Sequence, residues 1–204
     1  MRHRTTRPEQ RSALFALYGA GFVTAFGAHA VAANLGHYAM GRRASLVDLG
    51  ILLALYDGAE VVLKPVFGAL ADRVGPRPVL IGGLLAFALA SVAFVLAGNP
   101  GLLGAARLAQ GSAAAAFSPA AGALVALTGG SGRQGRSFGG YGAAKSFGYL
   151  IGPIVGGALV LAGGYGLLFE LIAVLALAAA VAAWVSVPAT RPRPRSRETL
   201  VGLG

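Results

Sequence analysis

Six apolar segments follow one another along the chain, each close to the roughly 20 residues that a helix needs to cross a bilayer. They cover residues 12–36, 47–70, 79–98, 102–127, 139–162 and 166–187. The 204 residues are 56% hydrophobic and 12% charged, with a mean hydropathy of +0.70, which is outside the range of water-soluble domains. The sequence therefore predicts an all-α integral membrane protein whose six transmembrane helices form a domain over residues 12–187.

Basic residues outside these segments predict how the chain is oriented. Arg42 and Arg43 lie between the first and second segments, and they are the only basic residues outside the segments on that side of the membrane. The opposite side has twelve: Arg2, Arg4, Arg7, Arg11, Arg73, Arg77, Arg133, Arg136, Arg191, Arg193, Arg195 and Arg197. Because cytoplasmic loops are enriched in Lys and Arg, both termini are predicted to be cytoplasmic, in the plasma membrane.

The two ends of the chain are predicted to lie outside the membrane. Residues 1–11 form a basic cytoplasmic N-terminus, and residues 188–204 form a basic tail in which arginine alternates with proline. Such a tail is expected to be extended beside the anionic leaflet. Ala28–Ala30 matches a signal cleavage pattern, but the apolar run from Ser12 to about Leu35 is longer than a signal core, so a retained helix is expected.

Composition and motifs argue against several other functions. The chain has no cysteine, no zinc-ligand spacing, no phosphate-binding lysine motif and no serine nucleophile elbow, so no enzyme activity, metal or cofactor is predicted. Residues 130–135 fit G-x-G-x-x-G, but no strand precedes them, and they are interpreted as a flexible loop. The net charge of +10 lies at the ends of apolar segments, which favours lipid headgroups over nucleic acid as the anionic partner.

A charged stretch between the second and third segments carries the first family resemblance. Its sequence, GALADRVGPRPVL from Gly68 to Leu80, resembles the G-x-L-A-D-R-x-G-R-K-x-x-L signature of the major facilitator superfamily, with Pro76 where the family has a basic residue. The resemblance implies a cytoplasmic loop in which Asp72 forms a latch with a helix N-terminus or an arginine. The gate residues are Gly68, Leu70, Asp72, Arg73, Gly75 and Arg77.

Two further stretches resemble the same family, in the expected order. Residues 107–111 fit its R-x-x-Q-G motif on the fourth helix. The fifth segment fits G-x8-G-x3-G-P-x2-G-G, a motif that the family associates with proton-coupled export; it consists of Gly139, Gly148, Gly152, Pro153, Gly156 and Gly157. Each glycine also has a simpler interpretation, which is close packing between helices.

The resemblance implies a function as well as a fold. The chain is similar to the N-terminal six-helix half of such a transporter, built from two three-helix inverted repeats. It implies transport of a small solute by alternating access, as proton-coupled efflux of drug-like or metabolite substrates, with a second six-helix half or a homodimer completing the pathway. The alternative is a truncated or split half that does not transport and acts as an assembly partner. The first segment lacks the acid that many proton-coupled relatives place there.

Apart from Asp48 at the start of the second span, six Asp, Glu, Lys and Arg residues lie inside the predicted spans: Asp57, Glu60, Lys64, Arg107, Lys145 and Glu170. A charge in hydrocarbon costs at least about 2.5 kcal/mol on insertion scales, so these side chains are expected to face one another or a wet cavity. Asp57, Glu60 and Lys64 share one face of the second helix. Glu170 lies near the outer edge, where interfacial water solvates it.

The first candidate for a proton carrier is Asp57, which lies near mid-membrane; the alternative is a fixed ion pair with Lys64, Arg107 or Lys145. Glu60 and Lys64 have the spacing of an intrahelical pair. The resemblance implies that Arg107 modulates a proton-binding acid or contacts an anionic substrate, and the alternative is a structural hydrogen bond.

Two more side chains keep open interpretations. Lys145 either lines the cavity or reaches the cytoplasmic headgroups. His29 could titrate near neutrality, but a hydrogen bond to a neighbouring helix is the simpler expectation.

Overall fold

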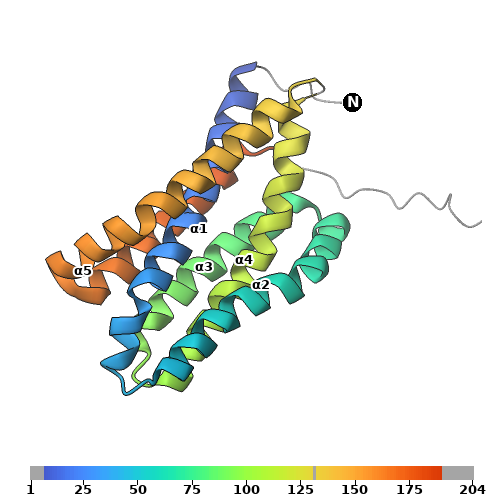
Figure 1. The fold of residues 1–204 in the computed structure, drawn as a ribbon. Helices are drawn as coiled ribbons and strands as arrows, with labels where there is room; N and C mark the ends of the chain where they lie inside the picture. Colours follow the sequence, from blue (N-terminus) through green and yellow to red (C-terminus); the bar gives the residue numbers. More distant parts are fainter. Residues whose placement is uncertain (1–6, 131, 190–204) are drawn as a thin grey trace, which may run out of the picture.

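The structure is a computed structural model that describes residues 7–130 and 132–189, and this part of the chain contains helices and no strands. Five helices follow in order: α1 (Arg7–Met40), α2 (Leu46–Val74), α3 (Pro76–Leu96), α4 (Pro100–Gly129) and α5 (Gln134–Ser186). The connections are short, and the helices form one bundle (Figure 1). Helix α1 begins before the predicted residue 12, so it includes part of the basic N-terminus. Residues 1–6 and most of the tail, 190–204, lie outside the described residues.

The described chain has five helices where the sequence predicts six. The difference lies in α5, which covers both the fifth and the sixth predicted segments. Its backbone leaves helical geometry at Gly163 (φ −151°, ψ 17°) and Gly164 (φ 76°, ψ −177°), and Figure 1 shows α5 running out and back around this point. A positive φ costs glycine little because it has no Cβ, so the chain can reverse there. The arrangement as two three-helix inverted repeats stays a prediction.

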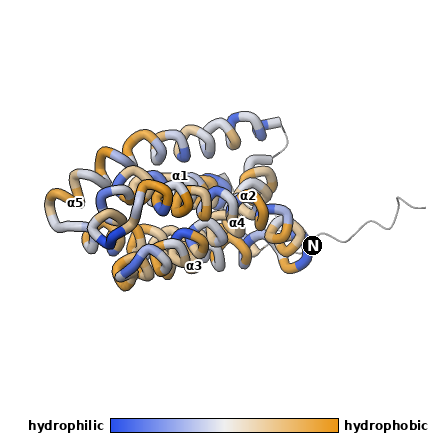
Figure 2. Tube along the Cα trace, turned by 60° about the horizontal axis from the view of Figure 1, so that its bottom comes forward, coloured by the Kyte–Doolittle hydropathy of each residue, from blue (hydrophilic) through white to orange (hydrophobic). Residues whose placement is uncertain are grey.

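Four of these five helices are long and apolar enough to cross a membrane: α1 from Pro8, α3, α4 and α5. Helix α2 is long enough, but Asp57, Glu60 and Lys64 interrupt its apolar sequence. Figure 2 shows hydrophobic residues along the labelled helices, including those at the periphery of the bundle. Large apolar side chains such as Leu89 and Leu161 are 72% and 90% exposed, which fits a hydrocarbon surrounding rather than water.

Local sequence signals explain where α2 and α4 begin. Ser45 caps α2, because its hydroxyl accepts a hydrogen bond from the Asp48 backbone N–H and the Asp48 carboxylate accepts one from the Ser45 backbone N–H. Asn99 caps α4 through its side-chain oxygen, which accepts from the Leu102 N–H, and Pro100 occupies the first helical turn.

Glycines allow the helices to pack at backbone distance. A Cβ added to Gly83 of α3 would lie 2.9 Å from the Phe117 nitrogen of α4. A Cβ on Gly111 of α4 would overlap the backbone of Tyr56 in α2. Helix α1 packs mainly on α5, α2 on α4, and α3 on α4 and α5. Small residues at such contacts are typical of membrane helices, which gain stability from close packing rather than from the hydrophobic effect.

Candidate functional site

A polar cavity of about 350 Å³ lies between α1, α2, α4 and α5. Two of its lining residues are acids, Asp57 and Glu60 of α2, and one is a base, Lys145 of α5. The other lining residues are Thr24, Ala25, Ala28, His29, Tyr56, Ala114, Phe117, Ser118 and Tyr149. Carboxylates, an ammonium group and aromatic rings therefore line one cavity, at which Asp57 and Tyr149 are exposed.

The acidic side of the cavity belongs to α2. Asp57 and Glu60 are three residues apart, and this helical spacing brings both to the cavity. The Glu60 Oε1 lies 2.7 Å from Lys64 Nζ, so the expected intrahelical pair is present, although Lys64 does not line the cavity. Within residues 7–130 and 132–189, this pair is the only salt bridge, so none of the proposed ion pairs of Asp57 is formed.

The basic side of the cavity belongs to α5. Lys145 Nζ lies 5.9 Å and 5.7 Å from the ring centroids of Tyr141 and Tyr149, where each ring face attracts the cation. Tyr149 also packs on His29 of α1, with ring centroids 4.2 Å apart. His29 Nδ1 hydrogen-bonds the Ala25 carbonyl of its own helix at 3.2 Å, rather than a neighbouring helix as expected. Lys145 is among the residues that line the cavity, and its role there stays a prediction.

Arg107 lies behind the cavity wall and does not line the cavity. Its side chain is 2% exposed, and its guanidinium stacks 4.5 Å from the centroid of the Tyr56 ring. Its Nε donates to the Leu52 carbonyl at 3.2 Å, and its Nη1 donates to Gln110 Oε1 at 2.8 Å. This geometry favours the structural interpretation of Arg107, because the side chain ties α4 to α2 and supports Tyr56.

Sequence reasoning missed the aromatic part of the cavity. Tyr56, Phe117 and Tyr149 resemble ordinary apolar core residues when they are read within a hydrophobic segment. A usable signal was present, since Tyr141, Lys145 and Tyr149 recur at intervals of four and so share one helix face.

The gate motif has a different local structure from the predicted loop. Helix α2 continues to Val74 and α3 begins at Pro76, so Gly75 alone joins them, with a φ of 98° that glycine tolerates. Gly68 and Leu70 thus belong to the last turns of α2. The motif is therefore a tight corner between two helices.

The charged residues of this corner differ in what they contact. Asp72 and Arg73 are exposed, and no ion pair of Asp72 occurs in the described part of the chain, so its latch stays a prediction. Arg77 Nη2 donates to the Trp184 carbonyl, and its guanidinium lies 5.0 Å from the centroid of the Trp184 ring. The corner is thereby fastened to the end of α5.

Three glycines of the fifth-segment motif face α1. A Cβ on Gly148 would lie 2.6 Å from the Phe22 carbonyl oxygen, one on Gly152 2.8 Å from the Phe26 oxygen, and one on Gly156 2.9 Å from Asn34 Nδ2. Gly139 has no neighbour within 4 Å of that position, and Gly157 meets only Asn34 Oδ1, at 3.7 Å. Pro153 lies inside the helix, where it removes one backbone donor. The geometry of this motif favours close helix packing.

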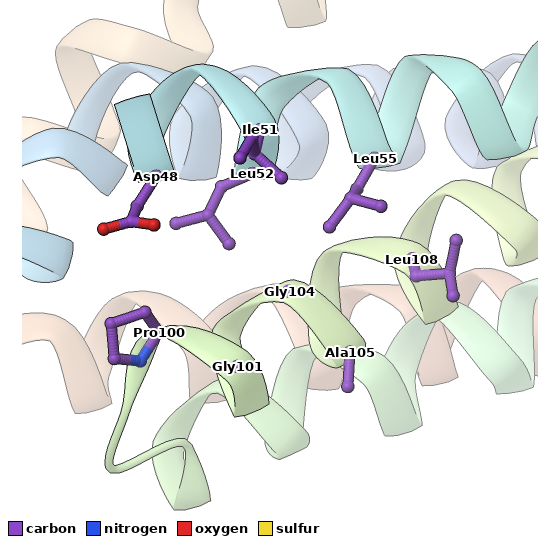
Figure 3. A pocket seen from close by; sticks show the side chains of 9 residues that line it. All are labelled: Asp48, Ile51, Leu52, Leu55, Pro100, Gly101, Gly104, Ala105 and Leu108. Atoms are coloured by element: carbon purple, nitrogen blue, oxygen red, sulfur yellow. The ribbon is translucent and has the colours of Figure 1, made fainter. Parts of the chain in front are cut away.

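A second cavity, also about 350 Å³, lies where α2 and α4 begin (Figure 3). Leu52, Leu55 and Leu108 give it an apolar lining, and Asp48 lies at one end. The Asp48 carboxylate already accepts hydrogen bonds from the backbone and hydroxyl of Ser45. This cavity offers no second charged group, so it is the weaker candidate for a site.

Comparison with known proteins decides the family. A sequence model described as Major Facilitator Superfamily matches residues 6–202, nearly the whole chain. The chain belongs to this superfamily. The predicted resemblance is thus confirmed, and the apolar helices of this superfamily member indicate a multi-pass protein of the plasma membrane.

Two kinds of relatives within the superfamily are drug-resistance proteins. Quinolone resistance protein NorA of Staphylococcus aureus is 29% identical over 110 residues, which cover 54% of this chain and 28% of NorA. Puromycin resistance protein pur8 of Streptomyces alboniger is 43% identical over 93 residues, which cover 45% of this chain and 18% of pur8. The chain therefore matches less than a third of the length of either relative. The family and these relatives support membrane transport, and nothing in them indicates catalysis.

Proposed function

We propose that this chain forms half of a proton-coupled efflux transporter that moves drug-like small molecules by alternating access. The observation that carries the proposal is the polar cavity between α1, α2, α4 and α5, in which Asp57 and Lys145 share one space without a salt bridge between them. Asp57 is exposed and Lys145 half-buried at this cavity, and charged side chains that face a cavity in a membrane bundle mark pathways for substrates or protons. In this account Asp57 is the proton carrier.

The chemistry of Asp57 suits that role. An ionised carboxylate is costly in a site closed to water, and a bound proton removes this cost. The neutral form therefore favours states in which the cavity is closed, and the ionised form favours states in which water reaches it. Lys145 supplies a nearby positive charge that stabilises the carboxylate after the proton has left. Glu60 is less suited, because Lys64 already holds its charge at 2.7 Å.

The lining of the cavity favours amphiphilic substrates. Phe117, Tyr56 and Tyr149 supply aromatic surface, while Thr24 and Ser118 supply hydroxyl groups. A site that combines aromatic surface with polar groups can bind small organic molecules. This agrees with relatives named for resistance to quinolones and puromycin.

A second six-helix half is needed to enclose a complete pathway in this proposal. The chain matches 28% of NorA and 18% of pur8, and in this proposal a further half or a second copy of this chain supplies the remaining wall. The basic residues outside the spans support a cytoplasmic position for both termini in this proposal. The alternative is a half that assembles with another membrane protein and moves nothing by itself.

Reconstitution in vesicles separates these alternatives. We expect vesicles that contain the native chain to accumulate a fluorescent quinolone when a pH gradient is imposed, and to lose this accumulation when a protonophore collapses the gradient. Chemical cross-linking of the same vesicles reports whether the active species is a dimer. A chain that stays monomeric and moves no quinolone would contradict the transport proposal and support the assembly partner.

A further inference from the structure

A second polar cavity, of about 450 Å³, opens at the end of the bundle where α1 begins, α4 ends and α5 begins. Its lining carries three arginines, Arg11, Arg133 and Arg136, and no acidic residue. The remaining lining residues are Gln10, Leu14, Phe15, Tyr18, Thr128, Gly129 and Ser137. Nothing in the transport proposal uses this cavity, which shares no lining residue with the cavity that contains Asp57 and Glu60.

We propose that this cavity binds the phosphate-bearing headgroup of an anionic membrane lipid. Three guanidinium groups provide up to fifteen N–H donors, and arginine is the side chain best suited to phosphate oxygens because its donors form a planar fork. Hydroxyl groups of Tyr18, Thr128 and Ser137 add further polar contacts around the same space.

The architecture of the α4–α5 connection concentrates this positive charge. Arg133 is the N-cap of α5, Arg136 lies in its first turn, and that turn contains no acid. The unpaired backbone N–H groups of a helix N-terminus favour an anion, and two arginines at this position add to that positive charge. A Cβ on Gly129 would lie 2.5 Å from Ser137 Oγ, so a glycine is needed to bring the end of α4 against α5.

The apolar part of the cavity indicates a lipid rather than a free phosphate. Leu14 and Phe15 line it beside the arginines, and the Phe15 side chain is 71% exposed. Both residues lie in the apolar sequence of α1, where acyl chains would surround them. An anionic lipid has a phosphate that can bind the arginines and acyl chains that can pack against Leu14 and Phe15. Basic pockets between helices on the cytoplasmic side recognise anionic headgroups in this way.

Native mass spectrometry of the full chain tests the proposal, with phosphatidylglycerol and phosphatidylcholine of identical acyl chains titrated separately. We expect the native chain to bind phosphatidylglycerol at least roughly tenfold more tightly than phosphatidylcholine, since each basic residue near the headgroup contributes to anion binding. The variant Arg133→Gln/Arg136→Gln should lose this preference, and Arg11→Gln should weaken it. All three side chains are exposed, so these variants are expected to fold, which circular dichroism checks.

The matched control is Arg43→Gln/Arg73→Gln, which removes two exposed arginines that do not line the cavity. It should keep the preference for phosphatidylglycerol. An equal loss in this control would show that only the net charge matters and would overturn the proposal. Displacement of phosphatidylglycerol by excess glycerol phosphate, which lacks acyl chains, would identify a free-anion site and overturn the assignment to a lipid.

Discussion

Asp57→Asn is expected to abolish quinolone accumulation driven by a pH gradient, with at least a roughly 100-fold lower rate, because an amide keeps the shape of the carboxylate and cannot carry a proton. Asp57 lines the polar cavity and forms no salt bridge within the described residues. Binding of the quinolone itself should change much less, because the aromatic lining is intact. Flux and equilibrium binding, measured on the same vesicles, separate the two effects.

Glu170→Gln is the matched control for this experiment. It removes another acid from the predicted spans, but Glu170 is exposed and does not line the cavity. Its flux should stay close to that of the native chain. Gradient-driven flux that persists in Asp57→Asn would remove Asp57 as the carrier, and Glu60 would become the remaining acid of the cavity.

Gly148→Val should destabilise the bundle by about 3 kcal/mol, because even the first added carbon would lie 2.6 Å from the Phe22 carbonyl oxygen and 2.9 Å from the Phe26 nitrogen. Backbone atoms cannot rotate away as a side chain would, so α5 must move away from α1. The measurement is thermal unfolding of the purified chain in a mild detergent, followed by loss of helical signal.

Gly139→Val provides the comparison within the same motif. No atom lies within 4 Å of its added Cβ, so the same chemical change should shift the unfolding temperature only slightly. If both variants unfold at the same temperature, the contact between α1 and α5 does not depend on glycine, and another function must explain the motif.

Periodicity and charge in the sequence predicted structural features that involve residues of a single helix. The three-residue interval between Asp57 and Glu60 predicted a shared face, and both side chains line the same cavity. The four-residue interval predicted the Glu60–Lys64 pair, which is present at 2.7 Å. The reversal between the fifth and sixth segments was predicted near residues 163–165, and the backbone breaks at Gly163 and Gly164.

Features that depend on two helices could not be predicted in the same way. The tight corner at Gly75 follows from its positive φ, and hydropathy alone suggested a longer loop. The sequence position of Arg107 is compatible with a side chain that faces a cavity or a neighbouring helix. Because α4 packs on α2, Arg107 donates a hydrogen bond to the Leu52 carbonyl and stacks on the Tyr56 ring. Tyr149 belongs to the cavity because α5 packs closely on α1, which brings its ring against His29.

The central claim is that α1, α2, α4 and α5 enclose a polar space that water reaches within the membrane. The chain has no cysteine, so a single introduced cysteine is the only site for a thiol reagent. Ser118 lines the cavity from α4, whereas Leu89 of α3 is 72% exposed on the apolar surface. We measure labelling of Ser118→Cys and Leu89→Cys by a charged, water-soluble maleimide added to both sides of intact bilayer vesicles. The account predicts rapid labelling of Ser118→Cys and almost none of Leu89→Cys; equal protection of both cysteines, or faster labelling at residue 89, would contradict it.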